Sequence, residues 1–217
     1  MPKKANSAYQ LQIIIQDSRP PIWRRVLVPV GFTFHDLHLA IQSAFDWENH
    51  HLYSFEIQNN SKLPARNFGA NIADLSIEEN NELGEINSRT EKISSHLQKI
   101  GDKITYTYDF GDNWDHKIVL EKIVENYDWT YPQCIKAVGH APCEDSGAIW
   151  GWEEKIEMLK KYNPKDEEQR ELYEWLCETV PAIDDLEDPR NFDPKKVDLD
   201  LINERLEDYK GMENAFS

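Results

Sequence analysis

Alternating apolar and polar positions predict β-strands along much of the chain. The clearest case is residues 9–16, YQLQIIIQ, where every second side chain is apolar and only Ile14 breaks the pattern. Four more segments have strand character: 22–28, 51–58, 103–110 and 114–123. The last two form a predicted hairpin, because the Gly-Asp-Asn sequence between them tolerates the positive φ angles of a tight turn.

One strong helical pattern follows the second predicted strand. Within residues 37–45 the apolar positions recur at i, i+3, i+4, i+7 and i+8, which places them on one helical face. Thr33 can cap this helix, and Asp36 stands three residues later, as in a capping box. Further helical patterns follow along the chain, at 93–100, 150–161, 165–178 and 198–209.

Two stretches lack a periodic pattern. Residues 59–91 are polar and rich in Asn, Glu and Ser, and we expect a long loop there. Residues 131–151 have the Gly and Pro content of a loop. Because the strands do not alternate regularly with helices, the order of elements indicates the α+β class. We predict one domain over residues 1–217, with a β-roll-like, mostly antiparallel sheet, a packed helix and a helical C-terminal part at 149–217.

The chain is strongly acidic, which changes the expected partners. Its 217 residues carry 24 Lys and Arg against 40 Asp and Glu, a formal net charge of −16. Nucleic-acid binding depends on neutralising phosphates, so this charge argues against it. A local basic patch of Arg19, Arg24 and Arg25 is an alternative that the sequence leaves open, but we expect these arginines to be solvated surface charges. Apolar residues make up 40% of the chain and include seven Trp, enough to build a folded core.

The cysteines and the N-terminus predict a cytoplasmic protein. Cys134, Cys143 and Cys177 form no disulfide-like framework, and the chain has no CxxC pair typical of a structural zinc site. Residues 1–10 lack the apolar stretch of a signal peptide. No apolar run approaches the roughly 20 residues that cross a bilayer, so we expect no membrane contact. The oligomeric state does not follow from the sequence.

The tip of the predicted hairpin, DFGDNWDH at 109–116, concentrates ionisable groups. Together with two acids of the later loop it suggests a binding or metal site of six residues: Asp109, Asp112, Trp114, His116, Glu144 and Asp145. Histidine and carboxylate ligands together suit Zn, Mn or Fe, so a divalent metal is the candidate cofactor. A structural interpretation competes with this one, because Asp112 is an ordinary turn residue and acids at 144–145 favour the start of a following helix.

The expected hairpin register places His116 on a half-buried face. Tyr106, Tyr108 and Phe110 would share a face of the first strand, and Trp114 and His116 would share a face of the second. A neutral imidazole with a partner suits such a face better than a charged one.

Two other histidine pairs occur, His35 with His38 and His50 with His51. Neither has a carboxylate at the spacing of a known zinc helix, so we interpret them as surface residues or hydrogen-bonded core residues rather than as ligands.

Three stretches carry a more specific resemblance. They are PPIWRRVLVP with LHLAIQSAFDWENHHLYSF, then YTYDFGDNWDHKIVLE, then YPQCIKAVGHAPCEDSGAIWGWEEKIEML with the later NFDPKKVDLDLIN. In order and spacing they resemble the plasmid pRiA4b Orf-3-like family over nearly the whole chain apart from residues 59–91. The resemblance implies a compact roll. Members of that family usually have Pro-Pro-Glu-Asp followed by two glycines, whereas this chain has Cys143 at the second proline and Ala148 at the second glycine.

Three functional hypotheses follow. The resemblance implies no established activity, and its plasmid- and transposon-associated members carry no mechanism with them. We first expect a non-enzymatic binding module for a protein partner or small ligand, with a groove between the hairpin at 109–116 and the loop at 139–148. The second hypothesis is a metal-dependent hydrolase that uses the Asp, His and Glu side chains of the same cluster. The third is a DNA-associated accessory protein of a mobile element, which would use the basic patch.

Overall fold

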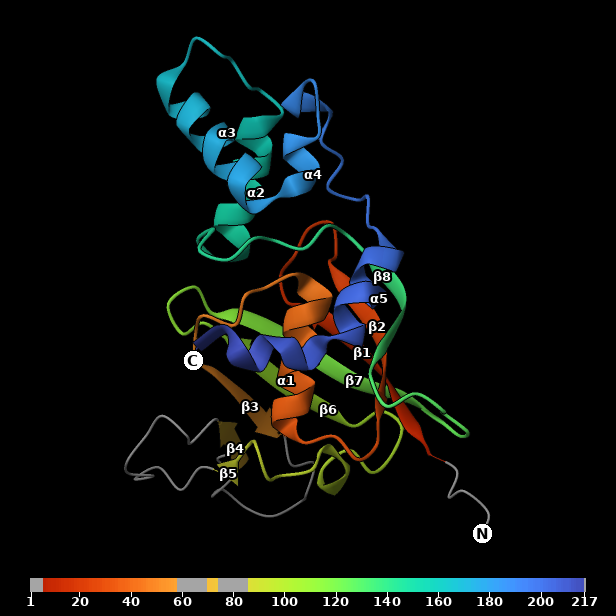
Figure 1. Cartoon of the computed structure of the whole chain (residues 1–217). Coiled ribbons are helices and arrows are strands. Elements are labelled where there is room, and N and C mark those ends of the chain that lie inside the picture. Colours follow the sequence, from red (N-terminus) through yellow and green to blue (C-terminus); the bar gives the residue numbers. More distant parts are fainter. Residues whose placement is uncertain (1–5, 58–69, 74–85, 217) are drawn as a thin grey trace.

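A mixed sheet of eight strands forms the centre of the protein (Figure 1). The computed structural model describes residues 6–57, 70–73 and 86–216. The strands are β1 (Ala8–Ile15), β2 (Trp23–Pro29), β3 (Tyr53–Ile57), β4 (Ala70–Ala73), β5 (Ile86–Asn87), β6 (Lys103–Tyr108), β7 (Trp114–Val124) and β8 (Gln133–Val138). They lie in the order β5-β4-β3-β6-β7-β1-β2-β8. All neighbours pair antiparallel except β4 and β5, so the predicted mostly antiparallel sheet is confirmed.

The helices of the described residues lie in two groups. They are α1 (Phe34–Phe45), α2 (Ala148–Leu159), α3 (Glu167–Thr179), α4 (Pro181–Asp184) and α5 (Leu199–Glu207), with short 3-10 helices η1 (Ile93–Ser95), η2 (Pro189–Asn191) and η3 (Tyr209–Phe216). Helix α1 lies against the sheet, and α5 and η3 pack on α1 (Figure 1). Helices α2, α3 and α4 form a second group beyond one end of the sheet (Figure 1). The α+β class is confirmed.

Helix α1 begins where its sequence predicts. Thr33 Oγ1 accepts the Asp36 N–H at 3.0 Å, and the Asp36 carboxylate accepts the Thr33 N–H at 2.8 Å, which completes the capping box. Of its 12 residues all but Asp36 are buried. A helix that is buried all round needs cover on both sides, and the sheet and the C-terminal helices provide it.

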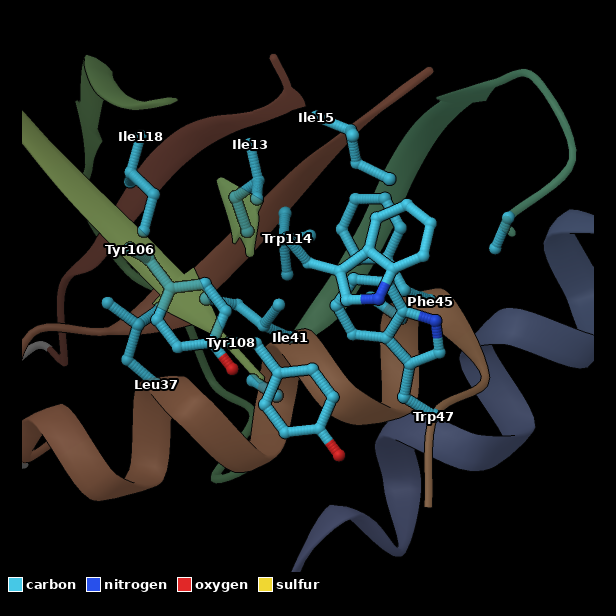
Figure 2. Close-up of a cluster of buried hydrophobic side chains, with 14 of the residues drawn as sticks. Ile13, Ile15, Leu37, Ile41, Phe45, Trp47, Tyr106, Tyr108, Trp114 and Ile118 are labelled. Atoms are coloured by element: carbon cyan, nitrogen blue, oxygen red, sulfur yellow. The ribbon is translucent and has the colours of Figure 1, made fainter. Parts of the chain in front are cut away.

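An aromatic cluster fills the space between α1 and the hairpin strands (Figure 2). The Trp47 ring stacks on Tyr108 with the ring centroids 5.2 Å apart, and its centroid lies 5.6 Å from that of Trp114 and 5.5 Å from that of Phe45. Each such ring buries a large apolar area, so the loop that follows α1 is packed firmly onto the hairpin.

The polar residues of α1 belong to this core. His38 lies 2.8 Å from the Tyr106 hydroxyl through Nδ1 and 2.7 Å from Asn49 Oδ1 through Nε2, and its ring stacks on Tyr53 at 3.6 Å. His35 Nδ1 lies 2.8 Å from the Tyr53 hydroxyl. Both are hydrogen-bonded core histidines, which confirms their interpretation.

The hairpin register agrees with the prediction except at its tip. Tyr106 stands opposite His116, and Tyr108 stands opposite Trp114. Strand β6 ends at Tyr108, because Asp109 adopts the left-handed conformation with a φ of 56°. Phe110 therefore does not continue the apolar face, and 52% of it is exposed. The prediction for Phe110 was wrong.

Three element predictions need correction. The expected loop at 131–151 contains β8, an edge strand that follows Pro132 and whose sequence QCIKAV does not alternate between apolar and polar residues. The helix expected at 93–100 is one 3-10 turn, η1. The loop expected at 59–91 includes β4 and β5, and most of its other residues lie outside the described part of the chain.

The basic patch that the sequence left open is not formed, and the expectation of solvated arginines is wrong for Arg24. Successive residues of a strand point to opposite faces, so Arg24 and Arg25 of β2 separate. Arg24 is buried, with 2% of its surface exposed, and Arg25 binds Glu121 through Nε at 2.5 Å. Arg19 lies outside the strand. The strand period thus removes the feature on which the DNA-binding hypothesis rested.

The structure also bears on the thiols and on membrane contact. Cys134, Cys143 and Cys177 are free, and burial raises the pKa of each. A raised pKa disfavours the thiolate, so none has the environment of an activated nucleophile. Within the described ranges, no helix combines the length and the apolar character that crossing a membrane requires.

Candidate functional site

Three segments that are distant in sequence meet beside the aromatic cluster: the loop 46–52 after α1, the β6–β7 turn at 109–113 and the segment 142–148, which leads into the first residue of α2. The Gly147 N–H donates to Asp112 Oδ2 at 2.9 Å, which ties the hairpin tip to the later loop. The Trp47 indole N–H donates to the Pro142 carbonyl at 2.8 Å, and the Asp109 N–H to the Leu52 carbonyl at 2.9 Å. The hairpin tip and the loop therefore meet, as the binding-module hypothesis requires.

The backbone of all three segments adopts unusual conformations. Residues with a positive φ between 55° and 82° occur in each of them: Asp46, Asn49, Asp109, Asn113, Asp145, Gly147 and Ala148. Residues other than glycine adopt this conformation at a cost, and such residues gather at functional sites more often than elsewhere. Their concentration here supports a functional interpretation of these loops.

The centre of the site is an imidazole between two carboxylates. His51 Nδ1 lies 3.8 Å from Asp109 Oδ1, and His51 Nε2 lies 3.4 Å from Asp145 Oδ1. One ligand atom from each of the three residues can be chosen so that all lie within 4.8 Å of one another. His51 Nε2 is buried and makes no well-directed hydrogen bond to the described residues. We call His51, Asp109 and Asp145 the His51 cluster.

A second group, Glu48, His50 and Glu144, lies at the neighbouring positions of the same loops and also brings its ligand atoms within 4.8 Å of one another. Both carboxylate oxygens of Glu144 are already in use. Oε1 accepts the Tyr108 hydroxyl, and Oε2 accepts the Glu48 N–H at 2.8 Å. Burial, more than the bond to Glu144, raises the pKa of Tyr108, which therefore remains a hydrogen-bond donor at neutral pH.

The six residues singled out in the sequence have different roles. Asp109 and Asp145 belong to the His51 cluster, and Glu144 belongs to the second group. Asp109 also accepts the Gly111 N–H at 2.8 Å, as a turn residue does. Asp112 holds the loop before α2 through the Gly147 N–H, and it is a member of neither group.

Trp114 and His116 lie in the core and not with the acids. Trp114 is buried against Trp47, and His116 is fully buried with its ring edge-on to Trp47 and Phe45. His116 Nδ1 lies 2.8 Å from the Trp114 carbonyl. Burial lowers the pKa of His116 to about 4, so the imidazole is neutral at pH 7. The neutral core histidine that the register predicted is present, and the proposed ligand set loses His116.

His51 takes the place expected for His116, and sequence reasoning passed over it. Its signal was the HH pair in ENHHLYSF, one of the stretches that carry the family resemblance. The pair was discounted because it lacks the spacing of a zinc helix. Such spacing is informative only when ligands share one element, whereas here they come from three loops.

The His51 cluster is chemically suited to a first-row divalent cation. One imidazole and two carboxylates suit Zn²⁺, Mn²⁺ or Fe²⁺. Ligands bound at about 2.1 Å can lie at most about 4.2 Å apart around one ion, so the three atoms need only a small movement to close on it. Three protein ligands leave at least one coordination position open for water or for a ligand.

Comparison with known proteins identifies the relatives of this chain. A sequence model of the plasmid pRiA4b ORF-3-like protein family matches residues 7–201. The chain belongs to this family. The uncharacterized protein y4hQ of Sinorhizobium fredii (strain NBRC 101917 / NGR234) is 34% identical over 171 residues, which cover 78% of this chain and 80% of y4hQ. The protein of unknown function MM3350 from Methanosarcina mazei Go1 has a crystal structure with a TM-score of 0.70 and 34% identity, which covers 90% of this chain and 97% of that chain.

One difference from the usual family sequence, the alanine at position 148, can be explained by its backbone conformation. Ala148 occupies the position of the expected second glycine, and it has a φ of 60°. Glycine adopts this conformation without steric cost, and alanine does not. Ala148 thus adopts a conformation that favours glycine, while Glu144 accepts the Tyr108 hydroxyl and Asp145 lies beside His51.

Proposed function

We propose that this pRiA4b ORF-3-like protein is a binding module that takes up one divalent cation in the His51 cluster. The observation that carries the proposal is the convergence of three ligand atoms, from three separate loops, within 4.8 Å of one another. In this proposal the open coordination position of the cation receives an oxygen atom of a small ligand or of a protein partner.

The surroundings of the cluster support binding of a ligand from outside. The Asp145 side chain is 73% exposed, so the cluster is accessible on that side. Three apolar side chains at neighbouring chain positions are also exposed: Leu52, Phe110 and Trp150, at 46%, 52% and 63%. Single exposed apolar residues are common, and these three support the proposal because each lies within five chain positions of a member of the His51 cluster.

A metal-dependent hydrolase is the second candidate, and the open coordination position favours it. Catalytic zinc sites have three protein ligands and a water, as the His51 cluster would. Glu144 is the nearby carboxylate that could serve as a general base. Its two oxygens accept hydrogen bonds from Tyr108 and from the Glu48 N–H, so it is held by the protein rather than directed at a water. We therefore rank binding above hydrolysis.

The net charge of −16 and the separation of Arg24 from Arg25 give the DNA-associated role no support. A cytoplasmic location is part of the proposal, and the three free cysteines support a reducing compartment.

Calorimetric titration with Zn²⁺ and Mn²⁺ tests the cation site. We expect one site in the wild type and a loss of affinity of more than about tenfold in His51→Ala, which removes a ligand, and in Asp109→Asn, which replaces a carboxylate ligand by a neutral amide. His96→Ala is the matched control, since His96 pairs with Glu91 and belongs to neither ligand group. Equal affinities in wild type and His51→Ala would eliminate the site.

Two assays on the cation-loaded protein separate the candidates. A binding module should capture ligands or partners that His51→Ala fails to capture, with His96→Ala behaving as wild type. A hydrolase should instead show cation-stimulated turnover in a screen of phosphoesters and peptides, and Glu144→Gln should reduce it strongly. Identical captured sets for all three proteins would argue against binding at this cluster.

A further inference from the structure

A cavity of about 510 Å³ lies between the sheet and the C-terminal helices, apart from the His51 cluster. Its lining comes from β2, the end of α1, the residues after β8, and the segment from α4 to α5. This volume is in the range of small-molecule sites in proteins, about 300–1,000 Å³.

The floor of the cavity contains an arginine without a counter-ion. Arg24 is 2% exposed, and its Nε donates to the Ala44 carbonyl at 3.0 Å. Its Nη1 donates to the carbonyls of Trp23, Val138 and Gly139 at 3.1, 3.2 and 2.9 Å. These acceptors are all neutral. Within the described ranges no carboxylate pairs with Arg24, and its Nη2 donates no hydrogen bond.

Burying a charge without a counter-ion is unfavourable, and this cost is seen in the pKa of Arg24. Burial lowers the pKa of Arg24 to about 10, and the neighbouring Arg205 acts in the same direction. The guanidinium is still charged at pH 7. Its charge therefore faces the cavity with one unused donor, which is the arrangement that an anionic group would complete.

The rest of the lining defines the body and the charge of the ligand. The buried part is apolar and includes Phe45, Phe192 and Ile202, with the Arg24 guanidinium 4.8 Å from the Phe45 ring centre. The exposed part carries Asp185, Asp193 and Asp198 against one exposed base, Lys196. Arg205, which also lines the cavity, pairs with Asp46. Because acids outnumber bases in this exposed part, they repel a dianion more than a monoanion and disfavour phosphate.

We propose that this cavity binds a small monocarboxylate with an apolar body, whose carboxylate accepts a hydrogen bond from Arg24 Nη2. The apolar body lies among Phe45, Phe192 and Ile202. The carboxylate of this ligand would accept a hydrogen bond from Arg24 Nη2, which has no acceptor within the described residues. The apolar body of the ligand would be removed from water when it enters the cavity.

The test is a set of NMR titrations of the full chain with hydrocinnamate, benzoate and octanoate, each beside its neutral alcohol. The signal of the Arg24 Nε–H reports the site, and its absence in Arg24→Lys assigns it. We expect a Kd on the order of 1 mM for at least one carboxylate, from the usual efficiency of ligands of this size. We expect binding of the alcohol to be more than about tenfold weaker, because the charge-assisted hydrogen bond is lost.

A second variant tests the location of the ligand without changing Arg24. Ala182→Trp places a large ring at the cavity wall without touching the hydrogen bonds of Arg24, and it should abolish binding. Glu178→Trp adds the same ring to exposed α3, outside the lining, and should bind as wild type.

Four outcomes would overturn the proposal. Equal binding of the alcohols would remove the role of the anion, and equal binding of inorganic phosphate would remove the role of the apolar body. Unchanged binding in Ala182→Trp would place the ligand elsewhere. No shift with any carboxylate at roughly ten times the expected Kd would leave the cavity without this function.

Discussion

The seven histidines of the chain differ in what surrounds their rings, and this difference decides their roles. His38 has a hydrogen-bond partner on each nitrogen and holds the core together. His116 lies among aromatic rings as a neutral base. His51 stands between two carboxylates with 30% of its side chain exposed. Histidine thus serves as a hydrogen-bonded core residue, as a neutral residue among aromatic rings and as a candidate metal ligand. Only the neighbouring side chains distinguish these three roles.

His116 should make the stability of the protein fall at low pH. The unfolded chain binds a proton at this residue near pH 6.5, whereas the folded chain does so only near pH 4. Acidification between these values therefore favours unfolding, and above about pH 7 the residue has no effect. We expect His116 to contribute a loss of about 3 kcal/mol by pH 4, since one pKa unit corresponds to about 1.4 kcal/mol.

Urea denaturation of the wild type and of His116→Phe at pH 7 and pH 4 measures this loss. The carboxylates titrate in both proteins, so the difference between their free energies of unfolding isolates His116. That difference should shift by about 3 kcal/mol in favour of the variant at pH 4. A difference that stays constant with pH would mean that His116 is protonated in the folded state as easily as in the unfolded state.

The start of helix α2 shows how an element boundary positions a site. Gly147 caps the helix with a φ of 82°, and Ala148 follows with a φ of 60°. These two residues turn the chain from the loop that carries Glu144 and Asp145 into the helix. The resemblance expects a second glycine at Ala148, and the left-handed conformation explains why glycine suits that position.

Ala148→Gly should stabilise the protein by about 1 kcal/mol, because it removes the steric cost of alanine in the left-handed region. The midpoint of urea unfolding should rise with an unchanged slope. Ala137→Gly is the control, since Ala137 belongs to strand β8 and glycine weakens a strand. If Ala148→Gly lowered the midpoint as Ala137→Gly should, the conformation at position 148 would not be strained.

The C-terminal part of the chain is tied back to the edge of the sheet. Asn203 on α5 accepts the Cys134 N–H at 2.8 Å and donates to the Cys134 carbonyl at 3.0 Å, so it covers the outer edge of β8. Arg205, also on α5, pairs with Asp46 at 2.7 Å beside the cavity. These contacts join α5 to the sheet, and one domain over residues 1–217 stays a prediction.

Asn203→Ala should lower the free energy of unfolding by about 1–3 kcal/mol, because it leaves both backbone groups of Cys134 without their partner. The Cys134 amide should also exchange its hydrogen faster. Glu204→Ala changes an exposed neighbour on α5 and should have little effect. As one domain, both variants should unfold in a single transition, and two separate transitions would contradict that prediction.

Local rules within the sequence were sufficient for much of the architecture. The period of two marked β1, the spacing of apolar residues and the Thr33 capping box marked α1, and the turn residues marked the hairpin. These features depend on neighbours within a few positions, so they could be predicted. The edge strand β8 was not predicted from the sequence, because one of its sides is covered by α5, which lies far along the chain.

The sequence by itself determined the acidic charge and the α+β class, whereas the contact between the hairpin and the loop before α2 was only a hypothesis until the structure showed it. Only the tertiary structure decided that His51 and not His116 joins Asp109 and Asp145, and that Arg24 faces a cavity instead of solvent. The physical reason is the same in both cases. Burial and the partners of a polar side chain are set by segments distant in sequence, and no local pattern records them.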